Sequence, residues 1–393
     1  MAGDMRVLIA GGGTGGHLFP GIAIAEEVVA RPGGTVLFVG TARGLETKLV
    51  PAAGFPLELL DVSGLNRVGL FKALKGLVRL PKAFFASRAV LNRFRPDLVL
   101  GVGGYASGPL VLAAALLGYP TAIQEQNSRP GFTNRVLGIF ASRVFVAFED
   151  ARSFFAQGKT RLLGNPVRRK FTAGTIAGPT SRPAPVAGST PGVTDAGTGV
   201  STGPRTGAGT VLILGGSQGA RAVNDLIAGA AALLAKEGRL PPIVHQTGNA
   251  DEARMRTRYR ELGLVTEGDA AITIRPFIDD MPAALADAAL VVGRAGALTL
   301  AELAMTGRPA ILIPLPTAAA DHQTSNAAEF ERAGAAVVAT QATTTPASLA
   351  GLITELMADP ARRAAMSRAM TALGRPAATR DIVDEMATLV KVA

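Results

Sequence analysis

The side chain best placed to transfer a proton in this sequence is His17. It directly follows a glycine-rich run at residues 11–16, which itself follows a short apolar stretch. A histidine at the mouth of a strand can act as a general base near neutral pH, whereas a packing or capping histidine is the alternative. A second cluster, residues 124–127, has four consecutive polar residues after an apolar stretch. Such a run suits a site for a polyhydroxylated ligand, and a solvated loop is its alternative.

The glycines of residues 11–16 satisfy a dinucleotide-binding pattern through Gly11, Gly13 and Gly16. That pattern also requires an acidic residue at the end of the next strand, where it holds a ribose. Residues 39–42 contain no acidic residue, which disfavours an NAD-dependent dehydrogenase. The glycines still allow the backbone to approach a ligand closely and to present N–H groups to it. A tight strand-to-helix turn is the alternative.

Three runs in the second half could bind a polar or charged ligand. Residues 215–221, which include Ser217, have the composition of an anion cradle that opens a helix. Thr299 and Glu302 are three residues apart and share one side of a predicted helix, although Thr-x-x-Glu is also an ordinary capping box. Residues 314–326 again place polar groups after a strand. No Asp-x-Asp pair occurs, which favours metal-free anion binding by backbone amides.

These groups must be positioned by alternating strands and helices. Each half of the chain begins with an apolar strand, a glycine turn and a helix: residues 5–10 with a helix from near Pro20, and residues 210–214 with a helix from Ala220. Further strands are predicted at residues 35–39, 97–101, 121–124, 144–147, 243–246, 289–292 and 310–313. The alternation predicts an α/β protein with two doubly wound parallel sheets. A ligand cleft would then lie between the carboxyl ends of their strands.

One segment, residues 172–209, lacks the composition of a folded domain. Of its 38 residues, 25 are Gly, Pro, Ser or Thr, and none is aromatic. It cannot bury enough apolar surface to offset its ordering entropy. We therefore predict an N-terminal domain at residues 1–171, a flexible linker at 172–209 and a C-terminal domain at 210–393, whose last helix is expected to pack back on the N-terminal domain.

Composition excludes several classes of protein. The 393 residues include no cysteine, which excludes disulfide scaffolds and cysteine-based metal centres, and only three histidines, which disfavours a histidine-rich metal site. Hydrophobic residues make up 48% of the chain and charged residues 18%, as in a soluble globular protein. We find neither a signal-peptide pattern nor an apolar run of about 18 residues. The expected location is the cytoplasm, or the cytoplasmic side of a membrane.

The excess positive charge lies in the first half. Residues 1–171 hold 21 basic and 10 acidic residues, whereas residues 172–393 hold 19 and 20. Residues 62–96 contain eight basic residues, no acidic residue and apolar side chains at near-helical spacing. This pattern suits an anionic membrane surface; a helix packed on the core is the alternative, and no nucleic-acid motif accompanies it. The membrane patch is predicted to comprise Leu70, Phe71, Lys72, Leu74, Lys75 and Arg79.

Seven runs, taken in order, resemble the MurG family, the UDP-N-acetylglucosamine (UDP-GlcNAc) transferases of peptidoglycan synthesis. The first is Gly-Gly-Thr-Gly-Gly-His at residues 12–17, continuing to Gly21. The others are residues 103–109, 125–127, 164–168, 215–221, 296–302 and 321–326. Each is modest alone, but together they cover nearly the whole chain except residues 172–209.

The resemblance implies a GT-B fold and an inverting, metal-independent transfer without a cofactor. N-acetylglucosamine would move from UDP-GlcNAc to the C4 hydroxyl of N-acetylmuramic acid in lipid I, giving lipid II and UDP. Tyr105 and Glu125 would lie near the acceptor, Glu302 on the ribose and Ile278 near the uracil. The implied UDP-GlcNAc contacts are Thr14, Gly15, Gly16, Asn127, Arg168, Ser217, Ile278, Ala297, Leu298, Thr299, Leu300, Ala301, Glu302 and Gln323. Implied partners are the anionic membrane and cell-wall and division proteins, and not nucleic acid.

The transfer needs a base for the acceptor hydroxyl and positive potential for the leaving diphosphate. We assign the base to His17, with Glu125 as its rival. Helix N-termini at Ser217 and Thr299, with Arg168, would stabilise the diphosphate. The competing hypotheses are a glycolipid glucosyltransferase, a UDP-GlcNAc epimerase, a catalytically silent UDP-sugar sensor at the membrane and the disfavoured dehydrogenase.

Overall fold

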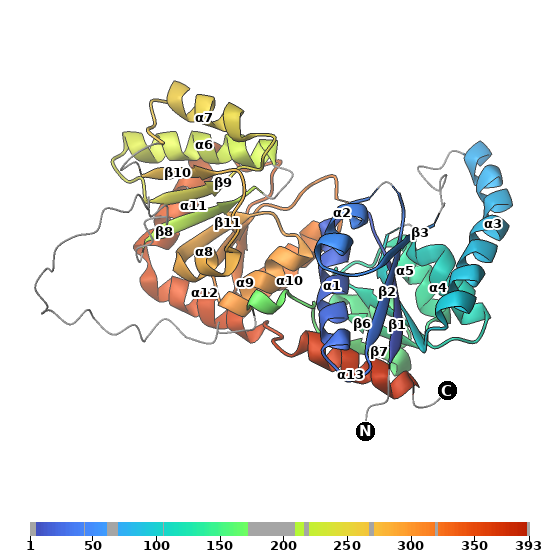
Figure 1. Cartoon of the computed structure of the whole chain (residues 1–393). Helices are drawn as coiled ribbons and strands as arrows, with labels where there is room; N and C mark the ends of the chain where they lie inside the picture. Colours follow the sequence, from blue (N-terminus) through green and yellow to red (C-terminus); the bar gives the residue numbers. More distant parts are fainter. Residues whose placement is uncertain are drawn as a thin grey trace, which may run out of the picture.

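A computed structural model gives the arrangement of the chain, which forms two α/β domains, each around one parallel sheet (Figure 1). It describes residues 5–42, 44–60, 70–104, 106–171, 209–215, 220–266, 271–318 and 321–390, with backbone alone for residues 70–81. The side chains of the predicted membrane patch (Leu70 to Arg79), the residues Tyr105 and Ser217, and the predicted linker up to residue 208 therefore lie outside the described part.

The N-terminal sheet has seven strands in the order β3-β2-β1-β4-β5-β6-β7, and every pairing is parallel. The middle of strand β1 is apolar, and its Val7, Leu8 and Ile9 have no exposed surface, as expected for a sheet covered on both faces. The strands are β1 (Arg6–Gly11), β2 (Thr35–Gly40), β3 (Leu57–Leu59), β4 (Leu98–Gly103), β5 (Thr121–Glu125), β6 (Arg143–Val146) and β7 (Thr160–Leu162).

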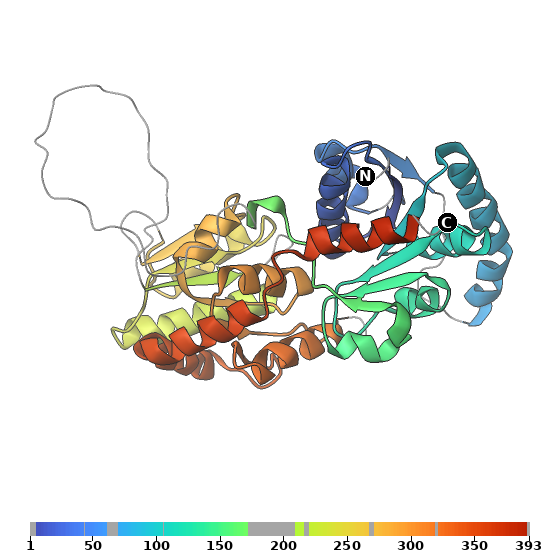
Figure 2. The same cartoon turned by 90° about the horizontal axis from the view of Figure 1, so that it is seen from below.

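Helices cover both faces of this sheet. One face packs on α1 and on the last helix of the chain, α13 (Ala378–Val390), which lies across this domain in Figure 2. The other face packs on α3, α4 and α5. The helices of this half are α1 (Gly15–Val29), α2 (Glu46–Ala52), α3 (Leu70–Phe94), α4 (Ser107–Leu116), α5 (Phe132–Phe140) and the short η1 (Asp150–Phe154), η2 (Gln157–Lys159) and η3 (Arg169–Phe171).

The C-terminal sheet has six parallel strands in the order β10-β9-β8-β11-β12-β13. Its strands are β8 (Thr210–Leu214), β9 (Ile243–Gln246), β10 (Ile272–Arg275), β11 (Ala288–Gly293), β12 (Ala310–Leu312) and β13 (Ala336–Val338). Helices α6, α7 and α11 supply one hydrophobic face, and α8, α9, α10 and α12 the other. Their bounds are α6 (Arg221–Lys236), α7 (Glu252–Glu261), α8 (Met281–Asp287), α9 (Ala297–Thr306), α10 (His322–Arg332), α11 (Pro346–Ala358) and α12 (Pro360–Ala372).

The predicted pair of doubly wound sheets is confirmed, and all nine predicted strands are present with ends shifted by no more than two residues. The predicted start of the first helix near Pro20 is wrong, since α1 begins at Gly15 and contains Pro20. His17 therefore lies in the first helical turn and not before it. The sequence missed β3, β7, β10 and β13, which are three- or four-residue strands near the sheet edges.

The topology places two switch points. The strand order reverses between β1 and β4 in one sheet and between β8 and β11 in the other. Ligands of open parallel sheets bind at such switch points, outside the carboxyl ends of the strands. The runs at residues 11–16, 103–104, 215 and 293–296 follow these four strands. No helix in the described ranges is long and apolar enough to cross a bilayer.

Candidate active site

The N-terminal switch point is closed by two glycine turns that touch each other. The N–H of Gly12 donates to the carbonyl of Gly103 across 3.2 Å. Gly103 and Gly104 have φ angles of +102° and +87°, which favour glycine. A Cβ on Gly103 would lie 2.8 Å from the ring of His17, so the imidazole rests directly on this turn. The fold therefore brings the first and second glycine runs and His17 together.

The ring of His17 is oriented by its own glycine loop. Its Nδ1 lies 3.3 Å from the carbonyl oxygen of Gly12, and because a carbonyl only accepts, Nδ1 carries the proton in this contact. Burial lowers the pKa of His17, the Gly12 carbonyl partly opposes that shift, and the charge of His322 on α10 lowers it further. The imidazole is therefore neutral at pH 7, and Nε2 is the nitrogen that can accept a proton.

Three of the predicted UDP-GlcNAc contacts lie where α1 begins. Thr14 is the N-cap residue, and Gly15 and Gly16 form the first turn, whose N–H groups have no partner within the helix. The helix dipole adds partial positive charge at this end. Thr14 and Gly16 are exposed, so a ligand at the switch point between β1 and β4 can reach them.

The carboxylate of Glu125, 2% exposed, is fully engaged by its own loop. One oxygen accepts from the Asn127 N–H at 2.9 Å, and the other accepts from Asn134 Nδ2 at 2.8 Å and from the Gly131 N–H at 3.3 Å. Burial raises the pKa of Glu125, and these hydrogen bonds only partly oppose the shift. Its geometry is that of a group that shapes residues 125–134.

The two domains meet at Asn326 of α10, which has no exposed surface. Its Oδ1 accepts from the Ser128 N–H at 2.8 Å, and its Nδ2 donates to Asn127 Oδ1 at 3.2 Å and to the carbonyl of Ala295 at 3.2 Å. Asn326 of the C-terminal domain therefore orients Asn127, a predicted UDP-GlcNAc contact of the N-terminal domain. Sequence reasoning missed this role, although the residue lies within the polar run after β12.

A second bridge joins Arg168 to Glu302 of α9. Arg168 Nη2 donates to Glu302 Oε1 at 2.8 Å, and its guanidinium lies 5.4 Å from the ring centres of both Phe19 and Phe171. Burial raises the pKa of Glu302, and Arg168 opposes that shift. Both predicted contacts thus sit together at the domain boundary, with the aromatic rings fixing the plane of the guanidinium.

The remaining predicted contacts are distributed around α9 and its neighbours. The capping-box alternative for Thr299 and Glu302 is wrong, because Gly296 is the N-cap and both residues lie inside the helix. Leu298 and Thr299 are partly exposed, whereas Leu300 is fully buried in the core, which leaves its backbone alone to reach a ligand. Gln323 Oε1 accepts from the Leu315 N–H at 3.0 Å, and Ile278 is partly buried after β10.

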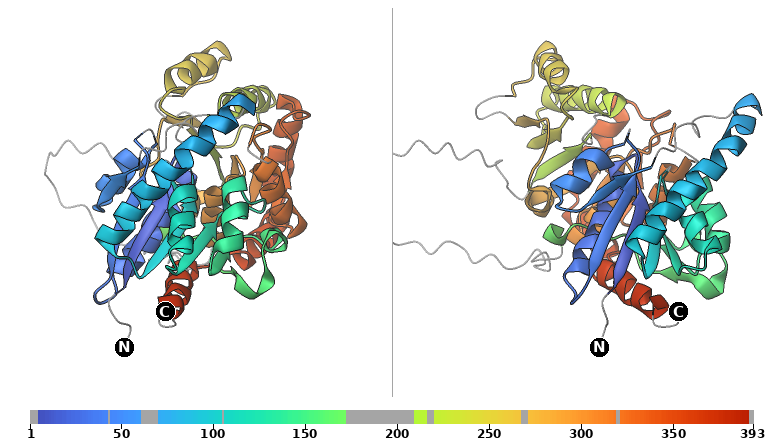
Figure 3. Two further views of the ribbon diagram at one scale, coloured as in Figure 1. Left: turned by 90° about the vertical axis from the view of Figure 1, so that its right-hand side faces the viewer. Right: turned by 45° about the vertical axis from the view of Figure 1, so that its right-hand side comes forward.

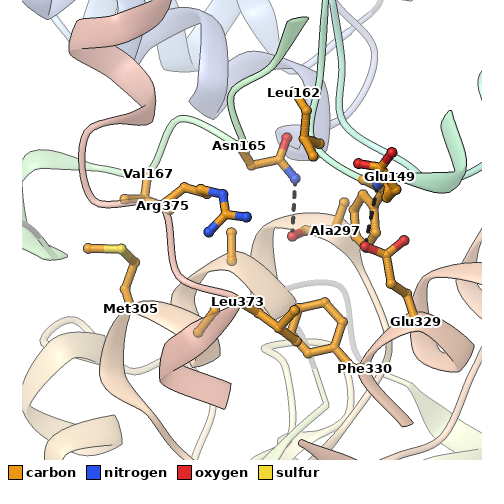
Figure 4. A pocket seen from close by; sticks show the side chains of 15 residues that line it. Glu149, Leu162, Asn165, Val167, Ala297, Met305, Glu329, Phe330, Leu373 and Arg375 are labelled. Atoms are coloured by element: carbon orange, nitrogen blue, oxygen red, sulfur yellow. Dashed lines mark hydrogen bonds between the residues drawn. The ribbon is translucent and has the colours of Figure 1, made fainter. Parts of the chain in front are cut away.

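Helix α9 also borders a cavity of about 220 Å³ between the domains (Figure 4). Ala297, Ala301 and Met305 line it; Ala297 is about half a helical turn from Thr299, whereas Met305 is three residues from Glu302 and shares its side of the helix. Asn165 Nδ2 donates to the carbonyl of Ala297 at 3.4 Å across this boundary. Ala297 and Ala301, both predicted UDP-GlcNAc contacts, therefore border this cavity.

Comparisons with known proteins place this geometry in a family. Residues 7–146 match the glycosyltransferase family 28 N-terminal domain, and residues 210–385 match the family 28 C-terminal domain. The chain is 47% identical over 388 residues to the UDP-N-acetylglucosamine--N-acetylmuramyl-(pentapeptide) pyrophosphoryl-undecaprenol N-acetylglucosamine transferase of Anaeromyxobacter sp. (strain Fw109-5), covering 98% of this chain and 94% of that protein. The protein with the same description from Myxococcus xanthus is 45% identical, with 97% and 92% covered.

A solved structure matches nearly the whole chain. The crystal structure of Acinetobacter baumannii MurG is 30% identical, with a TM-score of 0.74 and coverage of 97% of this chain and 98% of that one. The predicted GT-B fold is thereby confirmed. The chain belongs to glycosyltransferase family 28 and, within it, to the MurG family.

Proposed function

We propose that this protein transfers N-acetylglucosamine from UDP-GlcNAc to the C4 hydroxyl of N-acetylmuramic acid in lipid I, releasing UDP and lipid II. The names of two relatives give UDP-N-acetylglucosamine, a pyrophosphoryl-undecaprenol acceptor and N-acetylglucosamine transfer, and the chain is 45–47% identical to these relatives over nearly its whole length. The observation that carries the mechanism is the neutral imidazole of His17, fixed on the Gly12 carbonyl at the N-terminal switch point.

In the proposed reaction, His17 Nε2 takes the proton of the acceptor hydroxyl as its oxygen attacks the anomeric carbon of the donor. The bond from that carbon to the diphosphate breaks, and UDP leaves with the bonding electrons. Arg168 and the N-terminus of α9 stabilise the developing negative charge. Glu302 accepts from the ribose hydroxyls, while Glu125 keeps Asn127 and the 125–134 loop in position.

We further propose that the α3–α4–α5 side of the N-terminal domain lies on the cytoplasmic face of the cell membrane. This side faces the viewer in the left panel of Figure 3. Phe85, Leu116, Phe132 and Ile139 are 62–81% exposed on these three helices. Arg88 and Arg135 are exposed on the same helices. Apolar side chains surrounded by basic ones suit a surface of anionic lipids.

The catalytic proposal is tested by UDP release from UDP-GlcNAc, with and without a short-chain lipid I analogue, in buffer containing EDTA. We expect release only with the analogue and no loss with EDTA. Release without an acceptor would indicate an epimerase or a hydrolase. Binding of the nucleotide sugar without any release would indicate another acceptor or a sugar sensor, and either result would contradict the proposal.

The membrane proposal is tested by sedimentation with vesicles that contain anionic phospholipid. Two variants, Phe132→Ser/Ile139→Ser and Lys72→Glu/Lys75→Glu/Arg79→Glu, should lose vesicle binding yet retain turnover of a soluble acceptor. The matched control Arg239→Glu/Arg256→Glu changes charge on the C-terminal domain and should bind as the wild type does. Unchanged binding of both test variants would show that these residues form only a solvated face.

A further inference from the structure

A buried carboxylate lies behind the catalytic glycine loop. Glu46, the first residue of α2, is 1% exposed and comes six residues after the end of β2. Its Oε2 accepts from the Gly13 N–H at 2.8 Å. Its Oε1 accepts from the Thr41 N–H at 2.8 Å and from the Thr41 hydroxyl at 2.7 Å. The carboxylate therefore ties the loop after β1 to the loop after β2.

Three glycines leave space for this side chain. A Cβ on Gly12 would lie 2.6 Å from Glu46 Cδ, and a Cβ on Gly40 would lie 2.6 Å from its Cγ. A Cβ on Gly44 would also meet the carboxylate at 2.5 Å from Cδ. Contacts this short do not occur between real side chains, so the loop after β1 and the loop after β2 both need glycine next to Glu46.

The carboxyl group of Glu46 is ionised in the folded protein. Burial raises its pKa, but the hydrogen bonds from Gly13 and Thr41 outweigh burial and hold the pKa below the ordinary glutamate value. The loop thus holds an anion supplied by the chain itself at Gly13, where a nucleotide phosphate would bind in a dinucleotide site.

A series of hydrogen bonds links Glu46 to His17, the proposed base. The N–H groups of Gly12 and Gly13 are taken by Gly103 and Glu46, and the carbonyl of Gly12 contacts His17 Nδ1. With both N–H groups held, the loop can keep the Gly12 carbonyl in one place and leave the N–H groups of residues 14–16 for a ligand.

We propose that Glu46 is a positioning residue for glycosyl transfer: its carboxylate fixes the glycine loop that orients His17 and presents residues 14–16 to the substrate. The His17 part rests on the proposed function, whereas the effect on the loop does not. A role in folding alone would make the same contacts but would leave the turnover of folded protein unchanged.

The test uses Glu46→Gln in the full chain. Glutamine has the same shape but only one acceptor oxygen, so its NH₂ group must face the Gly13 N–H or the Thr41 N–H. We expect kcat to fall by at least about tenfold, the range for losing a hydrogen bond to a charged group, with a smaller change in the KM for UDP-GlcNAc. Hydrogen exchange of the amides of residues 12–17 should accelerate, while exchange in the C-terminal sheet should not change.

Two further variants complete the design. Thr41→Val removes one of the hydrogen bonds and should give a smaller loss of kcat, which keeps the test valid if Glu46→Gln folds poorly. Glu58→Gln, at a carboxylate paired with Arg93 on the same domain, should behave as wild type. Wild-type kcat and loop exchange in Glu46→Gln, or a lower Tm with unchanged kcat, would overturn the inference. If His17→Asn retains turnover, the base assignment fails, but accelerated loop exchange with lower kcat in Glu46→Gln would still support loop positioning.

Discussion

The ion pair between Arg168 and Glu302 gives a quantitative prediction for UDP-GlcNAc binding. Glu302 lies on α9 and Arg168 in the segment between β7 and η3, and Nη2 and Oε1 lie 2.8 Å apart. The side chain of Glu302 is 16% exposed and that of Arg168 is 36% exposed. Glu302→Gln keeps the shape of the side chain but removes its charge, whereas Arg168→Met removes the guanidinium and keeps most of the length.

The size of each effect follows from this geometry. Hydrogen bonds to charged groups contribute about 1.5–3 kcal/mol, which is about 10- to 150-fold in Kd. Because Arg168 is partly exposed, we expect the lower part of this range for Arg168→Met, about tenfold. Glu302 is better buried, and Glu302→Gln removes the negative charge from its bonds to both the ribose and Arg168, so the variant should weaken UDP-GlcNAc binding by about 30- to 100-fold.

The assay is isothermal titration of UDP-GlcNAc into the wild type, both single variants and the double variant at pH 7. Since the two groups touch each other and the same ligand, their effects should be non-additive by about 0.5–3 kcal/mol. Glu149→Gln, at an exposed pair with Arg152, serves as the control and should bind normally. Additive effects, or wild-type Kd values in both single variants, would refute the assignment of this pair to the donor site.

Three other predictions follow from single groups. Because burial lowers the pKa of His17, wild-type kcat/KM should stay level around pH 7 and fall only below the ordinary histidine pKa. His17→Asn should lose about 10²–10⁴-fold in kcat, and a pH-rate series on both proteins checks both expectations. His245 is fully buried between Tyr259 and Asn224, and burial lowers its pKa to about 3. The unfolded chain therefore binds more protons than the folded one between pH 6.5 and 3, and this group alone should lower the unfolding free energy by about 1.4 kcal/mol for each pH unit of acidification in that window. Urea melts at pH 7 and pH 5 measure this slope, and His245→Gln should flatten it. Thr345→Ala removes the capping box of α11, in which Thr345 Oγ1 accepts from the Ser348 N–H at 3.1 Å, and should lower stability by about 1 kcal/mol in the same melts without changing kcat.

The sequence predicts the sheets well because parallel strands buried on both faces are continuous apolar runs. β1, β4 and β8 could be recognised for this reason, whereas β3 and β13 are too short and too close to the sheet edge to give a pattern. The start of α1 was misplaced because Pro20 suggested a first turn, yet the glycines before it are already helical. Glycine has no side chain to contribute to a hydrophobic pattern, so the pattern cannot show that Gly15 and Gly16 belong to the helix.

The candidate site could be predicted only where it is local in sequence. His17, Thr14 and the α9 residues follow strands directly, so topology alone brings them to a switch point. Asn326 and Glu46 act on loops 199 and 33 residues away in the chain. Residues 39–42 contain no acidic residue, but Glu46, a few residues further along, reaches the glycine loop through Gly13. Such contacts depend on tertiary packing and leave no local signal.

The most direct test of the proposed transfer is the structure of the product formed from UDP-GlcNAc carrying ¹³C at the sugar C1 and a short-chain lipid I analogue. We expect the label in a single disaccharide, β-linked to C4 of N-acetylmuramic acid, and we expect His17→Asn to form it at least about a hundredfold more slowly. Label recovered as a free sugar, as an epimerised nucleotide sugar or in an α-linkage would contradict the proposed transfer.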